Sequence, residues 1–263
     1  MAAGKSIWYG VTVTSNTIRL GISICWAFVA TIHAHGQSFN IDLNMVGGSP
    51  QLGAGTPSET FGAAAGQAGF WNGVGALVGS PISLSDLLGN TTDATVLKTA
   101  DNPGGVGGFS FTGNTGDFAL LLNDAEQVAT LVSGGNLTYT FSGLASGAYD
   151  VYTYAAHRAG AFSATPVFVP EAVTSNTQIV TGPMPGNAFQ YLITHSIHRV
   201  VLQAGGEFHI SITQPPNHSQ GMNVNGIQIV AVPEPSSALG IAFGAAIVLL
   251  RRSKLGTAER ERK

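Results

Sequence analysis

Short segments in which apolar and polar residues alternate constrain the fold of this chain more than any other feature. Phe39, Ile41 and Leu43 alternate with Asn40 and Asp42, which is the period of a half-buried β-strand. Ten further strands are predicted at Ala94–Thr99, Phe109–Thr112, Phe118–Leu122, Asn136–Phe141, Ala148–Ala155, Ser163–Val169, Asn176–Val180, Phe189–Leu202, Glu207–Thr213 and Asn225–Val230. Clusters of Gly, Asn, Ser and Pro separate them. The pattern predicts an all-β chain folded as a β-sandwich.

Composition narrows the class of protein. Only 10% of the residues are charged, and 35 of 263 are glycines without a collagen-like period. Residues 37–230 carry three basic and eleven acidic side chains, a net charge of −8, whereas the last thirteen residues have a net charge of +4. Collagen, a charged disordered tail and a nucleic-acid-binding protein are therefore excluded, and the asymmetry is typical of an exported domain with a cytoplasmic basic end.

The N-terminus has the three parts of a signal peptide. The apolar run Leu20–Ile32 follows basic residues and precedes Ala34 and Gly36, small residues at the −3 and −1 positions. We predict that residues 1–36 are removed by signal peptidase after Gly36; a membrane anchor or a buried helix is the alternative. Cys25, the only cysteine, lies in this segment, so the mature protein would have no disulfide.

The C-terminus also has three parts in a fixed order. Pro233-Glu234-Pro235 forms an extended motif, because proline cannot continue a helix. The apolar run Ser236–Leu250 follows as a short predicted transmembrane helix, and Arg251 and Arg252 orient it with its basic end in the cytoplasm.

This tail, residues 231–263, resembles the PEP-CTERM sorting signal of Gram-negative bacteria that make exopolysaccharide. The resemblance implies recognition by a membrane-embedded exosortase, cleavage near Pro233-Glu234-Pro235, and transfer or release of the ectodomain to the cell surface or matrix. The sequence departs from the family in the eleven residues, Ser253–Lys263, that follow the arginine pair. An ordinary C-terminal anchor is the alternative.

The segment Thr138–Tyr154 is the most informative part of the ectodomain, residues 37–230. Two strands rich in aromatic and β-branched residues flank a loop in which Gly143 and Gly147 permit positive φ and Leu144 can close one end of the core. The segment resembles the paired strands of jelly-roll carbohydrate-binding modules, which implies a jelly-roll-like sandwich. One short helix is predicted near Asp124–Val128, where the acids suit a helix N-terminus.

Motifs for catalysis and metal binding are missing from the sequence. It has no nucleophile elbow, zinc-protease helix, phosphate loop or EF-hand. His195 and His198 fall on opposite faces of a predicted strand, which separates them as metal ligands and makes surface or edge positions the simpler interpretation. We predict no cofactor and no metal. An alternative, a glycoside hydrolase, would need two carboxylates from among Glu59, Glu126, Glu171 and Glu207.

Sugar binding requires an exposed aromatic face with polar side chains beside it. The side chains that could supply this are Trp71, Asn72, Tyr152, Tyr154, His157 and Arg158. The alternative is structural: Trp71 plugs a loop, the tyrosines pack between sheets, and Arg158 pairs with an acid such as Asp150.

Two hypotheses on function follow from the sequence. The first is an exported, non-catalytic cell-surface or matrix protein, anchored transiently by its C-terminal helix, processed by signal peptidase and exosortase, and able to bind exopolysaccharide. The second is an extracellular hydrolase that acts on matrix polysaccharide.

Overall fold

The computed structural model describes residues 36–43, 55–75, 79–101, 106–110, 113–128, 135–157, 164–214 and 222–233. The predicted signal peptide as far as His35 and the predicted sorting signal from Glu234 onward, with Arg251 and Arg252, lie outside these residues, as does Arg158. In the part of the chain that is described, no helix has the length and apolar character needed to cross a membrane.

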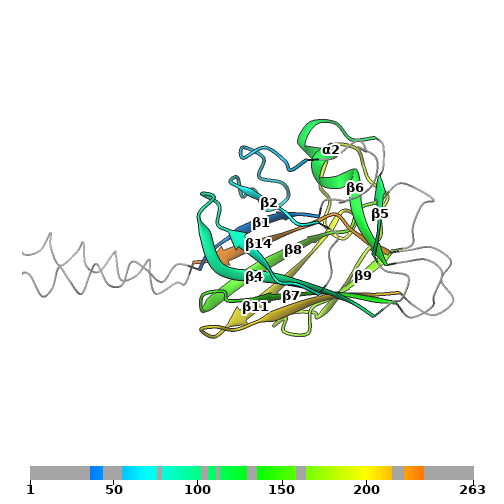
Figure 1. Cartoon of the computed structure of the whole chain (residues 1–263). Coiled ribbons are helices and arrows are strands. Elements are labelled where there is room, and N and C mark those ends of the chain that lie inside the picture. The colour runs from blue at the N-terminus through cyan, green and yellow to red at the C-terminus, as the bar shows by residue number, and fades with distance from the viewer. Residues whose placement is uncertain are drawn as a thin grey trace, which may run out of the picture. The chain divides into compact units, whose positions relative to one another are not determined.

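Three sheets make up the domain (Figure 1). Sheet A contains, in spatial order, β11 (His195–Leu202), β8 (Gly147–Tyr154), β14 (Gly226–Val232), β1 (Phe39–Asp42) and β2 (Trp71–Gly73). Sheet B contains β10 (Thr177–Val180), β9 (Thr165–Phe168), β12 (Phe208–Thr213), β7 (Asn136–Ser142), β4 (Thr91–Ala100) and β3 (Ile82–Ser85). Sheet C contains β13 (Met222–Val224), β6 (Asp124–Val128) and β5 (Val106–Ser110). Neighbouring strands are antiparallel except β1 and β2.

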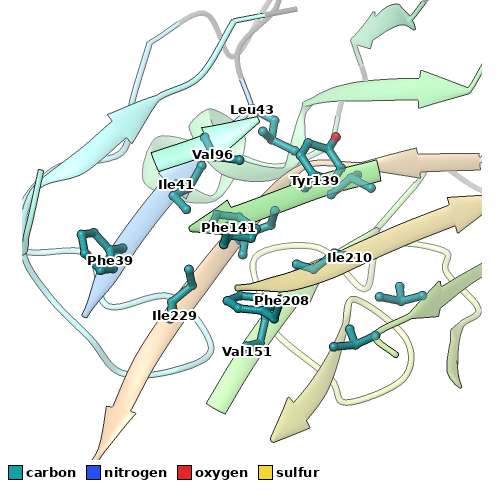
Figure 2. Close-up of a cluster of buried hydrophobic side chains, with 14 of the residues drawn as sticks. Phe39, Ile41, Leu43, Val96, Tyr139, Phe141, Val151, Phe208, Ile210 and Ile229 are labelled. Carbon is teal, nitrogen blue, oxygen red and sulfur yellow. The ribbon is translucent and has the colours of Figure 1, made fainter. Parts of the chain in front are cut away.

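The hydrophobic core lies between sheets A and B, as Figure 2 shows. Alternation decides which side chains enter it: Phe39 and Ile41 of β1 and Tyr139 and Phe141 of β7 belong to one cluster, and all four are completely buried. The rings of Phe141 and Phe208, on paired strands, stack with centroids 4.9 Å apart. The predicted all-β sandwich is therefore confirmed.

Two predicted elements were exchanged, and the predicted strand Phe189–Leu202 began too early, since β11 starts only at His195. Residues Phe118–Leu122 were predicted as a strand, but Gly116–Leu122 forms the α-helix α2, and the predicted helix at Asp124–Val128 is the strand β6. A short apolar run without alternation suits a helix and a strand equally well. β6 pairs with β5 and with the distant β13, and this pairing overrides the local helix signal. Figure 1 shows α2, β5 and β6 grouped at one end of the sandwich.

The loop between β7 and β8 has the predicted form. Leu144 is 1% exposed and belongs to the core, and Gly143 and Gly147 have φ values of 75° and 145°. A Cβ atom on Gly143 would collide with the carbonyl oxygen of Asp93 on the neighbouring strand. Position 143 therefore requires glycine for two reasons, the positive φ and the close approach of the Asp93 carbonyl oxygen.

Replacing Gly143 with alanine is expected to lower the free energy of unfolding by about 2–4 kcal/mol, because left-handed strain and the collision with Asp93 add together. Urea unfolding followed by tryptophan fluorescence measures the loss. Gly205 is the matched control, since its φ of 69° is similar and its surroundings are open. Gly205→Ala should cost only about 1–2 kcal/mol, and equal losses for the two variants would show that the collision has no effect.

Candidate functional site

The outer face of sheet A carries the chemically richest surface among the described residues. In β8, Tyr149 and Val151 point into the core, which leaves Asp150, Tyr152 and Tyr154 on the outer face. Cross-strand pairing with β11 places His195 opposite Tyr154 and Arg199 opposite Asp150. Aromatic and charged side chains are thus gathered in one strip.

A cluster of rings covers the aromatic end of this strip, and we call it the aromatic cluster. Its members come from four named elements and two loops: Phe61, Trp71, Phe118, Tyr152, Tyr154, Phe189 and His195. Ring centroids of Phe118 and Phe189 are 4.8 Å apart in a stacked arrangement, and those of Tyr152 and His195 are 5.8 Å apart, also stacked. The rings therefore form one continuous apolar surface.

Exposure divides the aromatic cluster into a floor and an accessible layer. Trp71, Tyr154 and His195 are at most 5% exposed and form the floor. Phe61, Phe118, Tyr152 and Phe189 are only half-buried and form the accessible layer. At the rim Tyr191 is 53% exposed, with its ring centroid 6.3 Å from that of His195.

A buried hydrogen-bond network fixes the turn at residues 62–67 over the sheet. The Tyr154 hydroxyl donates to Gln228 Oε1 at 2.5 Å and accepts from the Ala64 amide at 2.9 Å. Gln228 Nε2 in turn donates to Asn40 Oδ1 at 2.8 Å. Burial raises the pKa of the Tyr154 hydroxyl well above its usual value, so this group remains a hydrogen-bond donor.

Two turns beside the aromatic cluster hold residues in the left-handed region. Ala63 has a φ of 46° and Leu192 a φ of 61°, and they are the two non-glycine residues with positive φ in the described part of the chain. Such backbone costs of order 1–3 kcal/mol and persists where the surroundings enforce it, often at functional sites. Ala63 itself packs against the aromatic cluster.

Polar groups stand beside the rings. Arg199 donates from Nε to Asp150 Oδ1 at 2.8 Å and from Nη2 to Asp150 Oδ2 at 2.7 Å, and both side chains are partly exposed. Asp150 thus pairs with Arg199, and the suggested pairing of Arg158 with an acid such as Asp150 concerns a residue outside the described part of the chain. Burial and the negative charge of Asp150 raise the pKa of Tyr152.

Most residues predicted from the sequence to bind a glycan have structural roles. Trp71 donates its indole N–H to the Phe61 carbonyl at 3.2 Å, as a loop plug would. Asn72 bridges Asn40 and Ser85 through backbone hydrogen bonds, and His157 lies under Gly182, 4% exposed. Together with the buried Tyr154, these side chains present no face to a sugar.

Among the described residues that were predicted to bind a glycan, Tyr152 is the one whose side chain remains accessible. The sequence did not indicate its neighbours Phe61, Phe118, Phe189 and Tyr191 as site residues. Each is an isolated aromatic residue in a loop or short helix, and only their approach in space makes them a surface.

The histidines of β11 occupy opposite faces, as alternation predicted, but the expected exposure was wrong. His195 is 5% exposed in the floor of the aromatic cluster, and His198 is fully buried. Burial lowers the pKa of each to about 4, so both are neutral near pH 7. No group of three or more His, Cys, Asp or Glu residues suited to a metal ion occurs in the described ranges.

The four glutamates proposed for a hydrolase are dispersed except for one pair. Glu126 is completely buried against Lys98, and Glu59 is exposed. Glu171 and Glu207 contact opposite ring nitrogens of His209, at 2.7 and 3.6 Å. This pair belongs to the outer face of sheet B, far from the aromatic cluster in the topology of the sandwich.

Neither protein-family models nor curated proteins give a match to this sequence. Among solved structures, protein YXIM from Bacillus subtilis is similar at 11% identity and a TM-score of 0.36, over 74% of this chain and 40% of that one. A structure of the plant peptide RALF23 in complex with FER and LLG2 is similar at 15% identity and a TM-score of 0.39, over 77% and 41%. A family 35 carbohydrate binding module from Clostridium thermocellum is similar at 15% identity and a TM-score of 0.29, over 59% and 100%. This chain thus spans well under half the length of the first two chains.

Proposed function

We propose that this chain is an exported, non-catalytic protein of the cell surface or extracellular matrix, with a jelly-roll-like β-sandwich that binds exopolysaccharide. Signal peptidase would remove residues 1–36, and an exosortase would recognise Pro233-Glu234-Pro235. The apolar segment and Arg251 and Arg252 would anchor the chain until that step. The two terminal patterns in the sequence support this route.

One observation carries the binding part of the proposal: the accessible layer of the aromatic cluster, with Tyr191 at its rim, lies beside the Asp150–Arg199 pair. Pyranose rings have apolar faces that stack on aromatic side chains, and their hydroxyl groups need directional donors and acceptors nearby. Tyr152 and Tyr191 offer rings, while the exposed edges of Asp150 and Arg199 offer an acceptor and a donor.

Replacing Tyr152 with alanine is expected to weaken binding of exopolysaccharide about 10-fold or more, which corresponds to about 1.4 kcal/mol. Affinity electrophoresis of the exported protein in gels that contain the host's exopolysaccharide measures the change. Leu88→Ala is the control, because Leu88 is 86% exposed and lies on the loop between β3 and β4. Equal retardation of the two variants would contradict the proposal.

Replacing Glu234 with alanine is expected to change C-terminal processing and surface retention, because the motif would lose its central acid. Mass spectrometry of both ends of the mature protein, with fractionation of the cells, measures the effect. Glu259→Ala removes an acid of the same tail outside the motif and should process normally. Normal cleavage and location of the Glu234→Ala protein would argue against recognition by an exosortase.

A further inference from the structure

The outer face of sheet B is lined mainly with hydroxyl groups, and Leu97 and His209 lie among them opposite Thr140. Leu137 and Tyr139 of β7 enter the core, so the residues between them face outward, and β4 and β12 follow the same alternation. We call this the hydroxyl face, and its residues are Thr95, Thr99, Asn136, Thr138, Thr140, Ser142, Ser211 and Thr213, all exposed or half-exposed.

Strand register arranges these side chains in rows. Thr99 lies opposite Thr138, Thr138 opposite Ser211, and Ser211 opposite Phe168, so one row crosses β4, β7, β12 and β9. With strands spaced about 4.8 Å apart, the row is about 14 Å long. It presents three consecutive hydroxyl groups and ends at an aromatic ring.

Hydrogen bonds within the hydroxyl face hold its groups in place before any ligand arrives. The hydroxyls of Thr138 and Ser211 are 3.0 Å apart, and Asn136 Nδ2 donates to Thr138 Oγ1 at 3.1 Å. Thr213 donates to Asn136 Oδ1 at 2.9 Å. Threonine on a strand also has little rotamer freedom, so a partner would lose little side-chain entropy by binding here.

Phe168 supplies the apolar part of this surface. It is 38% exposed at the end of the row, and Ile179 of the adjacent β10 is 51% exposed on the same face. An exposed ring that continues a row of ordered hydroxyl groups matches the two needs of a glycan strand, stacking and directional hydrogen bonds.

Charge decides between the kinds of polymer that could lie on the hydroxyl face. Glu171 and Glu207 stand beside it around His209, and Ser142 donates to Glu207 Oε2 at 3.0 Å. The lysine and the arginine that the structure describes are both elsewhere: Lys98 is buried, and Arg199 is on the outer face of sheet A. The hydroxyl face would therefore repel an acidic polysaccharide or a nucleic acid and accept a neutral glycan.

We propose that the hydroxyl face is a second glycan-binding surface, for a neutral polysaccharide chain, and that one domain thereby joins two polysaccharide chains. The second part rests on the proposed function, which assigns the first polysaccharide chain to the aromatic cluster. Because sheets A and B pack through their inner faces, their outer faces point in opposite directions, and two polysaccharide chains can bind without contact between them.

The test combines a binding assay with a cross-linking assay on the exported full chain. The probes are soluble dextran and a soluble β-glucan, with alginate as the acidic control. Binding is measured by affinity electrophoresis, and cross-linking by the clustering of beads coated with the glycan that binds. Variants of the hydroxyl face are Phe168→Ala and Thr138→Val, the latter removing one hydroxyl while keeping shape and strand preference. Thr91→Val, on β4 outside the rows, is the matched control, and circular dichroism confirms folding.

The expected result is that the wild-type chain clusters the beads, whereas Phe168→Ala and Thr138→Val still bind glycan through the aromatic cluster but cluster the beads at least about 10-fold less, as the loss of one of two sites requires. Tyr152→Ala, which weakens the first surface, should lose clustering to a similar degree. Thr91→Val should behave like the wild type. Binding without clustering by the wild type, or clustering unchanged in Phe168→Ala and Thr138→Val, would overturn the second surface and leave the proposed function intact. Absence of binding to every glycan, the host's exopolysaccharide included, would overturn both. Stronger binding to alginate than to neutral glycans would overturn the assignment by charge.

Discussion

Replacing Lys98 with methionine is expected to lower the free energy of unfolding by about 3–5 kcal/mol, because it leaves the carboxylate of Glu126 buried without its cation. Lys98 faces inward on β4, as Ala94 and Val96 do. At such a position the alternation of the strand predicts an apolar side chain. Its ammonium lies 2.5 Å from Glu126 Oε1 and also donates to the Gly75 carbonyl, and both charged side chains are fully buried.

The response of Glu126 to pH makes this prediction sharper. Burial raises the pKa of Glu126, and Lys98 and the Tyr139 hydroxyl, which donates to Oε2 at 2.7 Å, oppose that rise. In Lys98→Met the pKa should rise further, so Glu126 can fold in its protonated form. A raised folded-state pKa stabilises the protein at low pH and loses that contribution as pH rises. The deficit of the variant should therefore grow from pH 5 to pH 8.

Urea unfolding of the wild type and of Lys98→Met at several pH values measures this deficit. The control is the double variant Lys98→Met/Glu126→Leu, which removes both charges and should recover more than half of the loss, with the Tyr139 hydroxyl left unpaired. If Lys98→Met unfolds within about 1 kcal/mol of the wild type at pH 8, the ion pair does not stabilise the sandwich as the geometry requires.

Acidification from pH 6.5 to pH 4 is expected to destabilise the protein through His195 and His198. The pKa of each is about 4 in the folded chain against 6.5 for an ordinary histidine, because burial disfavours the charged ring. Between these values the unfolded chain binds protons that the folded chain does not. The contribution of each histidine to the free energy of unfolding is therefore complete above pH 6.5 and decreases toward pH 4, by roughly 3 kcal/mol for each histidine.

His198→Leu isolates one of these contributions. Neither ring nitrogen of His198 has a hydrogen-bond partner among the described residues, so an apolar side chain of similar size should be tolerated in the core. The difference in unfolding free energy between variant and wild type should shift in favour of the variant by roughly 3 kcal/mol between pH 7 and pH 4.

The comparison with the wild type is needed because Asp124 acts in the opposite direction. Burial and the charge of Glu126 raise the pKa of Asp124 to about 8, so the folded chain takes up this proton before the unfolded chain does, and stability rises as pH falls from 8 toward 4. Asp124 is present in both proteins and cancels in the difference. A difference that stays constant from pH 7 to pH 4 would mean that His198 titrates normally in the folded protein.

The sequence was sufficient to predict the all-β class and most strands of the sandwich. Alternation is a local property of the sequence, since the position of a residue along β7, β8 or β12 decides which face of the sheet its side chain is on. The same local signal predicted Leu144 as a core residue between two glycines with positive φ. It also placed His195 and His198 on opposite faces.

The tertiary structure alone decided what covers each face. Alternation shows that Tyr152 and Tyr154 share a face, but not that His195 of β11 lies opposite Tyr154, nor that the turn at residues 62–67 and the segment around Phe189 fold over them. The same limit explains why β6 was mistaken for a helix and why Lys98 was not recognised as a core residue, since the partners that satisfy them, β13 and Glu126, are distant in sequence. Periodicity determines which way a side chain points, whereas burial and pairing depend on which distant segment arrives opposite it, and only the packed fold contains that information.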